Sequence, residues 1–276
     1  ALCCALLLVP SALAAETLKY VALVDGGKKA GEQTVTTGDD GVTRVDFIFK
    51  DNGRGPELKE EYQLAADGTF QRYQVKGVST FVAPVAETFT RDGDMGRWKS
   101  TSDAGTHTFT DTALYTPLGG TPATTSVALA ALARRPDGKL PLVPSGTLTQ
   151  RRLASMDISS GSQSRTVDLV ALTGIGFSPS FVWVTREAQP RMFAYIYPGF
   201  LQLIEDGWQG TANTLEARQK VAEREALFLV GLLSLVDVIL QVPMEKALAP
   251  LALGADIDAA RALSPSGPAG SRPPAT

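Results

Sequence analysis

The chain has 276 residues, of which 44% are hydrophobic and 20% charged, and its formal net charge is −3. This length suits one large domain or two small ones with a buried core, and the composition is that of a globular protein. The acidic balance and the scattered Lys and Arg residues argue against nucleic acid as a partner, because such binding needs a concentrated basic surface.

Residues 1–14 are predicted to be a secretory signal peptide with a truncated start. The stretch "ALCCALLLVPSALAAE" has a short apolar run, then Pro10 and the small-residue motif Ala-Leu-Ala at 12–14, which is the pattern of a cleaved leader. The run is too short to span a bilayer. We therefore expect an exported protein, periplasmic or secreted.

The two cysteines of the chain, Cys3 and Cys4, both lie inside this segment. They precede most of the apolar run, whereas the cysteine of a lipoprotein follows it. A mature chain that begins after the leader would contain no disulfide, no zinc–thiolate site and no cysteine nucleophile.

Residues 16–210 are predicted to form an antiparallel β domain. Asp-Gly pairs recur, for example at 40–41, 67–68 and 92–93, and this pair suits a tight hairpin turn because Asp tolerates and Gly readily adopts a positive φ. Between the turns, apolar and polar residues alternate, as in "VTRVDFIFKD" at 42–51. Alternation with a period of two indicates strands with one buried face.

One short helix is predicted to interrupt the strands. Thr121 and Pro122 resemble an N-cap followed by proline at the first helical position, residues 127–132 supply an apolar body, and Pro136 ends the helix. The predicted fold is therefore mainly β: a curved antiparallel sheet or partly open barrel, with this short helix and a long helix at the C-terminal end.

The strands after the short helix carry most of the large aromatic residues. Two interpretations are open: the rings line a groove for an apolar ligand, or they fill the core of a curved sheet, which is the more common role. The residues of the candidate groove are Phe181, Trp183, Phe193, Tyr195, Tyr197 and Phe200.

Residues 211–242 are predicted to form the C-terminal helix, with Asn213 as N-cap and Glu216 completing a capping box. Its second part, 226–242, is apolar but short for a membrane span and contains Asp237, so a buried or partner-binding helix is favoured over membrane contact. Residues 243–276 are predicted to be an irregular, disordered tail because they are rich in Pro, Gly and Ala.

No catalytic set is recognisable in the sequence. His107 is the single histidine, so neither a histidine-based metal site nor a serine triad with a nucleophile elbow can be assembled around it. It lies in "THTFTDT" at 106–112, which alternates like a strand. A carboxylate site for Ca²⁺ at 92–94 or 39–40 lacks the ligand spacing of a known loop.

Several stretches nevertheless resemble the N-terminal region of exported bacterial amidohydrolases of the imidazolonepropionase-like type. They are "YVALVDGGKKAGEQTV", "GVTRVDFIFKDNGRGPELKEEYQL", "ALTGIGFSPSFVW", "AYIYPGFLQLIEDGW" and "LEARQKVAERE". The resemblance covers about residues 16–225. It implies a β-rich accessory region that precedes a metal-dependent TIM-barrel domain, where zinc or a similar divalent metal would bind. The metal ligands of the family belong to that domain, so none is assigned to this chain.

After residue 225 the sequence departs from that pattern and resembles a truncated or frame-shifted reading. The first functional hypothesis is a non-catalytic accessory domain whose partner is the catalytic amidohydrolase domain of a parent protein that acts on C–N bonds. The second is a free-standing periplasmic protein that binds an apolar small molecule in a half-barrel groove. The third is an envelope protein anchored by the helix at 226–242. Whether the chain itself is an enzyme stays open.

Overall fold

The computed structural model describes residues 16–24 and 26–240. The predicted leader at 1–14 and the predicted tail at 243–276 lie outside them. Within this part of the chain, one sheet contains the strands β1 (Glu16–Val24), β2 (Lys28–Thr37), β3 (Val42–Phe49), β4 (Glu57–Leu64), β5 (Phe70–Val78), β6 (Pro84–Asp92), β7 (Met95–Lys99), β8 (Ala104–Thr108), β9 (Leu114–Tyr115), β10 (Leu140–Val143), β11 (Thr147–Ser160), β12 (Gln163–Thr173), β13 (Ser180–Thr185), β14 (Met192–Tyr197) and β15 (Leu201–Glu205). The helices are α1 (Thr124–Ala133), the short η1 (Gln209–Thr211) and α2 (Ala212–Leu240).

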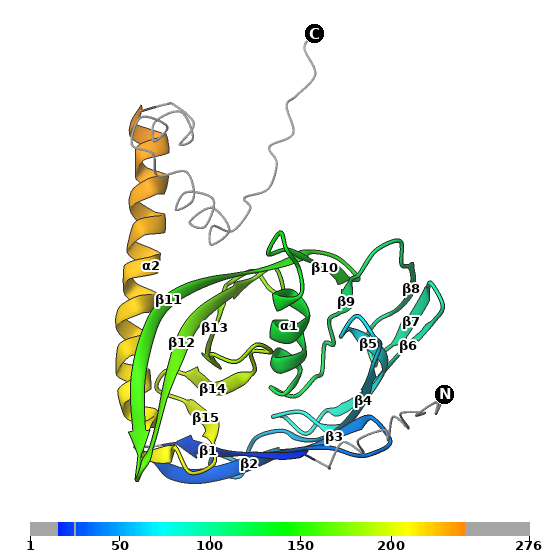
Figure 1. Cartoon of the computed structure of the whole chain (residues 1–276), viewed down its shortest axis with the longest axis horizontal. Helices are drawn as coiled ribbons and strands as arrows, with labels where there is room; N and C mark the ends of the chain where they lie inside the picture. The colour runs from blue at the N-terminus through cyan, green and yellow to red at the C-terminus, as the bar shows by residue number, and fades with distance from the viewer. Residues whose placement is uncertain (1–15, 25, 241–276) are drawn as a thin grey trace, which may run out of the picture.

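The sheet is a half-open barrel. Its strand order is β8-β7-β6-β5-β4-β3-β2-β1-β15-β14-β13-β12-β11-β10-β9, so β8 and β9 are the two edges. Neighbouring strands pair antiparallel except β9 and β10, which are parallel. The sheet curves around α1, while α2 lies along its outer face (Figure 1). The predicted fold class, a curved and mainly antiparallel sheet with one short and one long helix, is confirmed.

The strands form where the sequence alternates, and Asp-Gly pairs form the turns between several of them. In β3, Val45, Phe47 and Phe49 are buried while Asp46 between them is exposed. In the turn that precedes β3, Gly41 has a φ of +71°, and the Asp40 carboxylate accepts a hydrogen bond of 3.0 Å from the Val42 amide. A side chain other than Gly would be strained at that φ.

The main core lies between α1 and the inner face of the sheet. Val127, Leu129 and Leu132 of α1 are buried there. They join a set of inward-facing aromatic side chains in which Phe89 and Tyr115 stack with ring centroids 4.4 Å apart. Helix α1 therefore fills the hollow of the half-barrel and does not cover its outside.

Helix α2 packs on the outer face through a second, smaller core. Leu215 and Ala222 of α2 contribute to it. Gln219 is fully buried; it accepts a hydrogen bond of 3.1 Å from Trp183 Nε1 and donates one of 3.0 Å to the Ile196 carbonyl oxygen. These two bonds fix the helix to β13 and β14. No helix among residues 16–24 and 26–240 combines the length and the hydropathy that a membrane crossing requires.

The predicted N-cap residues of both helices, Thr121 and Asn213, are wrong. Helix α1 begins at Thr124, with Ala123 and not Thr121 as its N-cap. The Thr121 hydroxyl lies before the helix, where it donates to the buried Glu60 and accepts a hydrogen bond of 3.3 Å from the Ala123 amide. Helix α2 begins at Ala212, so Asn213 lies inside its first turn and accepts a hydrogen bond from Gln202.

The turns between antiparallel strands alternate from one end of the half-barrel to the other, so they form two sets. We call the "apolar end" the one formed by the turns at 26–27, 50–56, 79–83, 100–103, 144–146, 174–179 and 198–200, together with the loop at 116–123. We call the "charged end" the opposite one, formed by the turns at 38–41, 65–69, 93–94, 161–162, 186–191 and 206–208 and by the segment at 109–113.

Replacing Gln219 by Ala is expected to lower the free energy of unfolding by about 2–3 kcal/mol, because it leaves the indole N–H of Trp183 and a buried carbonyl oxygen without partners. Urea unfolding monitored by tryptophan fluorescence measures the change. Thr214→Ala, on the exposed face of the same helix, is the control and should stay within about 0.5 kcal/mol of the wild type. Equal effects of the two substitutions would contradict the assignment.

Candidate functional site

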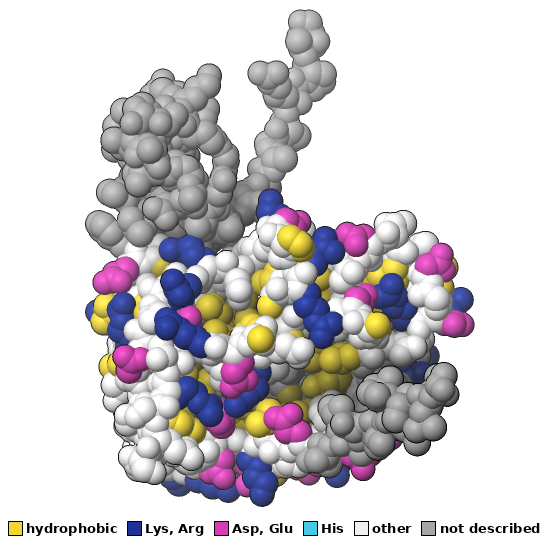
Figure 2. Space-filling view, in the orientation of Figure 1, with side chains coloured by type: hydrophobic (Ala, Val, Ile, Leu, Met, Phe, Trp, Pro, Cys, Tyr) yellow, Lys and Arg dark blue, Asp and Glu magenta, His cyan; other side chains and the backbone are white. Residues whose placement is uncertain are grey.

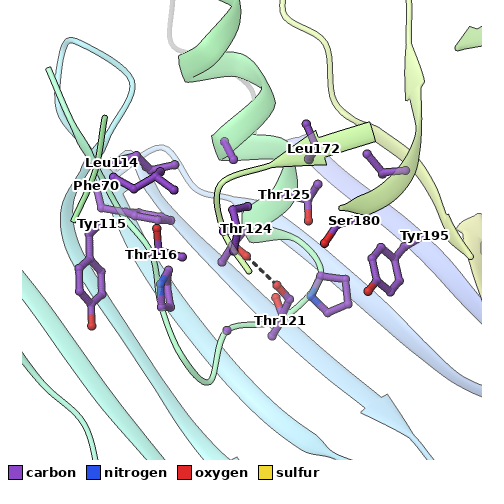
Figure 3. Close-up of a pocket in the computed structure, with 17 residues that line it drawn as sticks. Phe70, Leu114, Tyr115, Thr116, Thr121, Thr124, Thr125, Leu172, Ser180 and Tyr195 are labelled. Atoms are coloured by element: carbon purple, nitrogen blue, oxygen red, sulfur yellow. Dashed lines mark hydrogen bonds between the residues drawn. The ribbon is translucent and has the colours of Figure 1, made fainter. Parts of the chain in front are cut away.

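A pocket of about 250 Å³ lies between α1 and the inner face of the sheet. Figure 3 shows Phe70, Leu114 and Tyr115 on one side of it and Ser180 and Tyr195 on the other. The lining residues are Phe70, Leu114, Tyr115, Thr116, Pro117, Gly120, Thr121, Pro122, Thr124, Thr125, Ala128, Leu142, Leu172, Ile175, Ser180, Val182 and Tyr195.

The inner wall of the pocket is apolar and its rim carries hydroxyl groups. Ala128, Leu172 and Val182 are buried members of the wall. The partly exposed lining residues include Thr125, Ser180 and Tyr195, while Ile175 is exposed at the apolar end. No Lys, Arg, His, Asp or Glu lines the pocket. In Figure 2, hydrophobic side chains are visible in the hollow between the positions of α1 and of β3–β5.

One hydroxyl in the lining has no partner. The Oγ1 atom of Thr116 is buried and makes no hydrogen bond to the described residues. By contrast, the nearby Thr124 hydroxyl donates to the Thr121 carbonyl oxygen at 2.9 Å. A buried hydroxyl without a partner is costly, so this atom lowers the stability of the protein.

The loop at 116–123, which we call the crossing loop, connects β9 to α1 and forms one side of the pocket. Glu87 of β6 holds its first part from inside the barrel. The buried Glu87 carboxylate accepts hydrogen bonds from the Tyr115 hydroxyl at 2.6 Å and from the backbone amides of Leu118 and Gly119 at 3.0 and 2.9 Å.

Glu60 of β4 holds the second part of the crossing loop. Its carboxylate accepts hydrogen bonds from the Thr121 amide at 2.7 Å, the Thr121 hydroxyl at 3.1 Å and the Tyr73 hydroxyl at 2.9 Å. Burial raises the pKa of Glu60 from 4.5 to about 7, although these hydrogen bonds oppose the rise. The same burial, with Glu60 beside it, raises the pKa of Tyr73.

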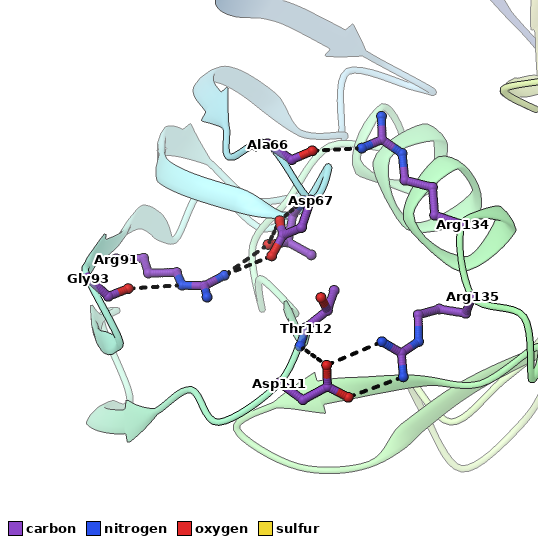
Figure 4. Close-up of polar contacts among 9 residues, drawn as sticks. Ala66, Asp67, Arg91, Gly93, Asp111, Thr112, Arg134 and Arg135 are labelled. Atoms are coloured by element: carbon purple, nitrogen blue, oxygen red, sulfur yellow. Dashed lines mark hydrogen bonds and ion pairs between the residues drawn. The ribbon is translucent and has the colours of Figure 1, made fainter.

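The far end of α1 is fixed at the charged end by arginines that follow the helix (Figure 4). The Arg134 guanidinium donates to the Ala66 carbonyl oxygen at 3.1 Å, and Arg135 pairs with the Asp111 carboxylate at 3.2 Å. Arg91 and Asp67, 3.0 Å apart, join two neighbouring turns there. Both ends of the helix that lines the pocket are thus held by specific polar contacts.

Local sequence explains why the two glutamates face inward. Glu60 lies between the buried residues Leu58 and Tyr62 at a spacing of two, and Glu87 lies two residues before the buried Phe89. Alternation therefore directs both carboxylates to the apolar face. A charged residue at an inward position of an alternating strand is the sequence signal for this site.

The six aromatic residues predicted to line a groove do not form one surface. Phe181, Trp183 and Phe193 belong to the core between the sheet and α2, and Trp183 and Phe193 are fully buried. Only Tyr195 lines the pocket.

The remaining two lie by the turn between β14 and β15. The exposed ring of Tyr197 packs edge-to-face on Phe200, and Phe200 packs in the same way on Phe49, with ring centroids 6.0 and 5.6 Å apart. They form a small aromatic cluster at the apolar end, separate from the pocket lining.

His107 lies on the edge strand β8 and packs edge-to-face on Phe109, with ring centroids 4.9 Å apart. In the part of the chain that the structure describes, no group of three or more His, Cys, Asp and Glu residues is arranged to hold a metal ion. The carboxylates that are buried deepest, Glu60 and Glu87, are instead occupied by the crossing loop.

No protein-family model matches this sequence, and no curated protein matches it. Among solved structures, the chain is similar to the crystal structure of a β-barrel-like protein of a domain of unknown function, DUF1849, from Brucella abortus. The TM-score is 0.43 and the identity 11%, over 68% of this chain and 94% of that chain.

Replacing Glu60 by Gln is expected to remove a dependence of stability on pH. Because the folded state raises the pKa of Glu60 from 4.5 to about 7, it binds this proton more tightly than the unfolded state. The contribution of Glu60 therefore falls as pH rises from about 5 to about 8, by about 3 kcal/mol in all.

The measurement is the difference in unfolding free energy between the wild type and Glu60→Gln at several pH values in this range. The control is Glu61→Gln, whose side chain is on the outer face of the same strand and 43% exposed. A wild-type-to-variant difference that is constant from pH 5 to pH 8 would show that Glu60 is not the group that titrates.

Proposed function

We propose that this protein is a non-catalytic binding protein for a small, uncharged, amphipathic molecule, which it holds in the pocket between α1 and the sheet. The observation that carries the proposal is the composition of that pocket: an apolar inner wall, a rim of hydroxyl groups and no ionic side chain. Ligand pockets in proteins are mainly apolar, with a few placed polar groups that set orientation.

The dimensions and the polar groups narrow the class of ligand. A volume of about 250 Å³ is slightly below the range of ~300–1,000 Å³ for drug-sized molecules, so the ligand is small. Its apolar body would contact Ala128, Leu172 and Val182, and a hydroxyl or carbonyl group would meet the hydroxyl groups of the partly exposed Thr125 and Ser180. A charged ligand is disfavoured because no opposite charge would compensate for its desolvation.

A second candidate function is the accessory domain of an exported amidohydrolase. Besides the sequence resemblance, the course of α2 favours it: the helix leaves the sheet and extends past its edge, as Figure 1 shows. A helix that extends in this way is a suitable connection to a following domain.

An amidase and peptidase assay of this chain with added Zn²⁺ tests its non-catalytic character. We expect no activity above a protein-free blank, and clear activity would contradict both proposals. For the accessory role, a coding frame that continues from codon 276 into a metal-dependent hydrolase domain is expected, and a stop codon directly after it would contradict that role.

Replacing Ala128 by Phe is expected to fill the pocket and weaken the binding of naphthol, a small neutral probe, by at least about tenfold. Titration of naphthol fluorescence measures the dissociation constant. Val221→Phe, the same kind of enlargement on the exposed face of α2, is the control and should bind like the wild type. If Ala128→Phe is folded by circular dichroism and binds naphthol normally, the probe does not occupy this pocket.

Replacing Thr116 by Val tests whether its buried hydroxyl lacks a partner. Valine has nearly the same shape, so removal of the unpartnered hydroxyl is expected to raise the free energy of unfolding by about 1 kcal/mol. Urea unfolding measures the change. A lower stability of Thr116→Val would show that the hydroxyl makes a hydrogen bond in solution.

A further inference from the structure

The outer face of β5, β6 and β7 carries a cluster of exposed cations. Outward-facing positions alternate along each strand, and the strand register aligns them in rows across the sheet. The cations are Arg72 and Lys76 of β5 and Arg97 and Lys99 of β7. Arg72 and Arg97 lie on either side of Thr90 of β6, and Lys99 pairs with Thr88 in the next row. The four charges thus flank β6 from both sides.

These four charges are not compensated by other described residues. None of the four side chains makes an ion pair within 4.0 Å in residues 16–24 and 26–240. The outward cations of the adjoining strands are paired instead: Lys59 of β4 lies 3.2 Å from the Asp46 carboxylate, and Arg44 of β3 lies 2.9 Å from Asp40. Positive charge therefore gathers on this face, although the net charge of the chain is −3.

Acidic residues border the cluster but do not lie between its members. Glu61 faces outward from β4, where it lies 3.6 Å from Arg44. Asp92, the one acidic residue on the outer face of the described strands β5–β8, lies at the end of β6 next to the turn at 93–94. Asp103 lies in the turn at 100–103, where its carboxylate accepts a hydrogen bond of 2.8 Å from Trp98 Nε1.

Two adjoining hollows lie among these cations. One has a volume of about 320 Å³ and the other of about 280 Å³. Arg72 lines the first hollow, and Lys76 and Lys99 line the second. Gln74 and Thr88 line both, so the two hollows form one shallow groove across the sheet. Short outward side chains on β6, such as Thr88, leave the space that the longer cations surround.

The cations are too far apart for one small anion. Neighbouring strands lie about 4.8 Å apart, so the backbones at Arg72 and Arg97, two strands apart, are separated by roughly 10 Å. Arg72 and Lys76 are four positions apart on β5, which is roughly 13 Å. A ligand that neutralises the cluster therefore carries several separated anionic groups. Between them, the amide of Gln74 and the hydroxyl of Thr88 offer hydrogen bonds to uncharged polar groups.

We propose that the groove on the outer face of β5, β6 and β7 binds a linear anionic polysaccharide. The cations contact the separated anionic groups of the chain, and the sugar hydroxyls between those groups bond to the amide and hydroxyl side chains of the groove. Complementary charge gives the association its direction and speed.

The side chains of this face distinguish a polysaccharide from other polyanions. Among the described residues, no exposed large hydrophobic side chain lies on β5, β6, β7 or β8. A bilayer surface would take such side chains into its acyl boundary, and single-stranded nucleic acid would stack its bases on exposed aromatic rings. The groove also lies on the opposite side of the sheet from the pocket beside α1, so the two binding proposals are independent.

Calorimetric titration with dextran sulfate tests the proposal. We expect the wild type to bind dextran sulfate at low salt, more weakly at high salt, and not to bind uncharged dextran. The double variant Lys76→Gln with Lys99→Gln is expected to lower the affinity for dextran sulfate by about tenfold, because it removes two exposed charges of the groove. Both lysines are exposed, so the variant should fold, and its naphthol affinity should equal that of the wild type.

The matched control is Lys28→Gln with Lys139→Gln, which changes the net charge equally at two exposed lysines outside the groove. Its affinity for dextran sulfate should equal that of the wild type. An equal loss in both double variants would overturn the proposal, as would a wild type that does not bind dextran sulfate at low salt. Binding of polyglutamate or oligo(dT) as tight as that of dextran sulfate would show that the face recognises charge and not a polysaccharide. Loss of naphthol binding alone would contradict the proposed function and leave the groove unaffected.

Discussion

The buried carboxylates of Glu60 and Glu87 fix the crossing loop to the inner face of the sheet. Glu60 and Glu87 face inward from neighbouring regions of the sheet. Glu60 accepts one backbone N–H group of the crossing loop and Glu87 accepts two, and each also accepts a tyrosine hydroxyl. Burying a charge is costly unless it is fully hydrogen-bonded. The loop supplies those bonds, and in return three of its own amide groups gain acceptors.

The position of α1 and the existence of the pocket follow from this arrangement. The crossing loop leads into α1, so fixing the loop fixes the first turn of the helix, and the arginines that follow α1 fix its other end. The pocket is the space left between a helix held in this way and the inner face of the sheet. Its apolar wall comes from strand alternation, whereas its hydroxyl-bearing rim comes mainly from the loop and the start of the helix.

Local patterning in the sequence was enough to predict the strands, the turns and both helices, because a period of two and Asp-Gly pairs are local signals. The pocket depends on contacts such as that of Thr121 with Glu60, 61 positions apart, and local sequence patterns do not indicate such contacts.

The faces on which the aromatic residues of β14 lie could not be predicted from the sequence either. The register shifts between β13 and β14, where Val184 pairs with Met192 and Trp183 with Ala194. This bulge changes which face the following side chains occupy, so Phe193 faces α2 while Tyr195 faces the pocket.

The parallel pairing of β9 with β10 has one more consequence. Two parallel neighbours cannot be joined by a tight turn, so the chain between them must cross a face of the sheet, and here it crosses the inner face as the crossing loop and α1. The interior of the barrel is therefore shaped by a connection and not by the strands. Insertions or deletions in that connection would resize the interior while every strand keeps its partner, so the size of the pocket can change in evolution without a change of the fold.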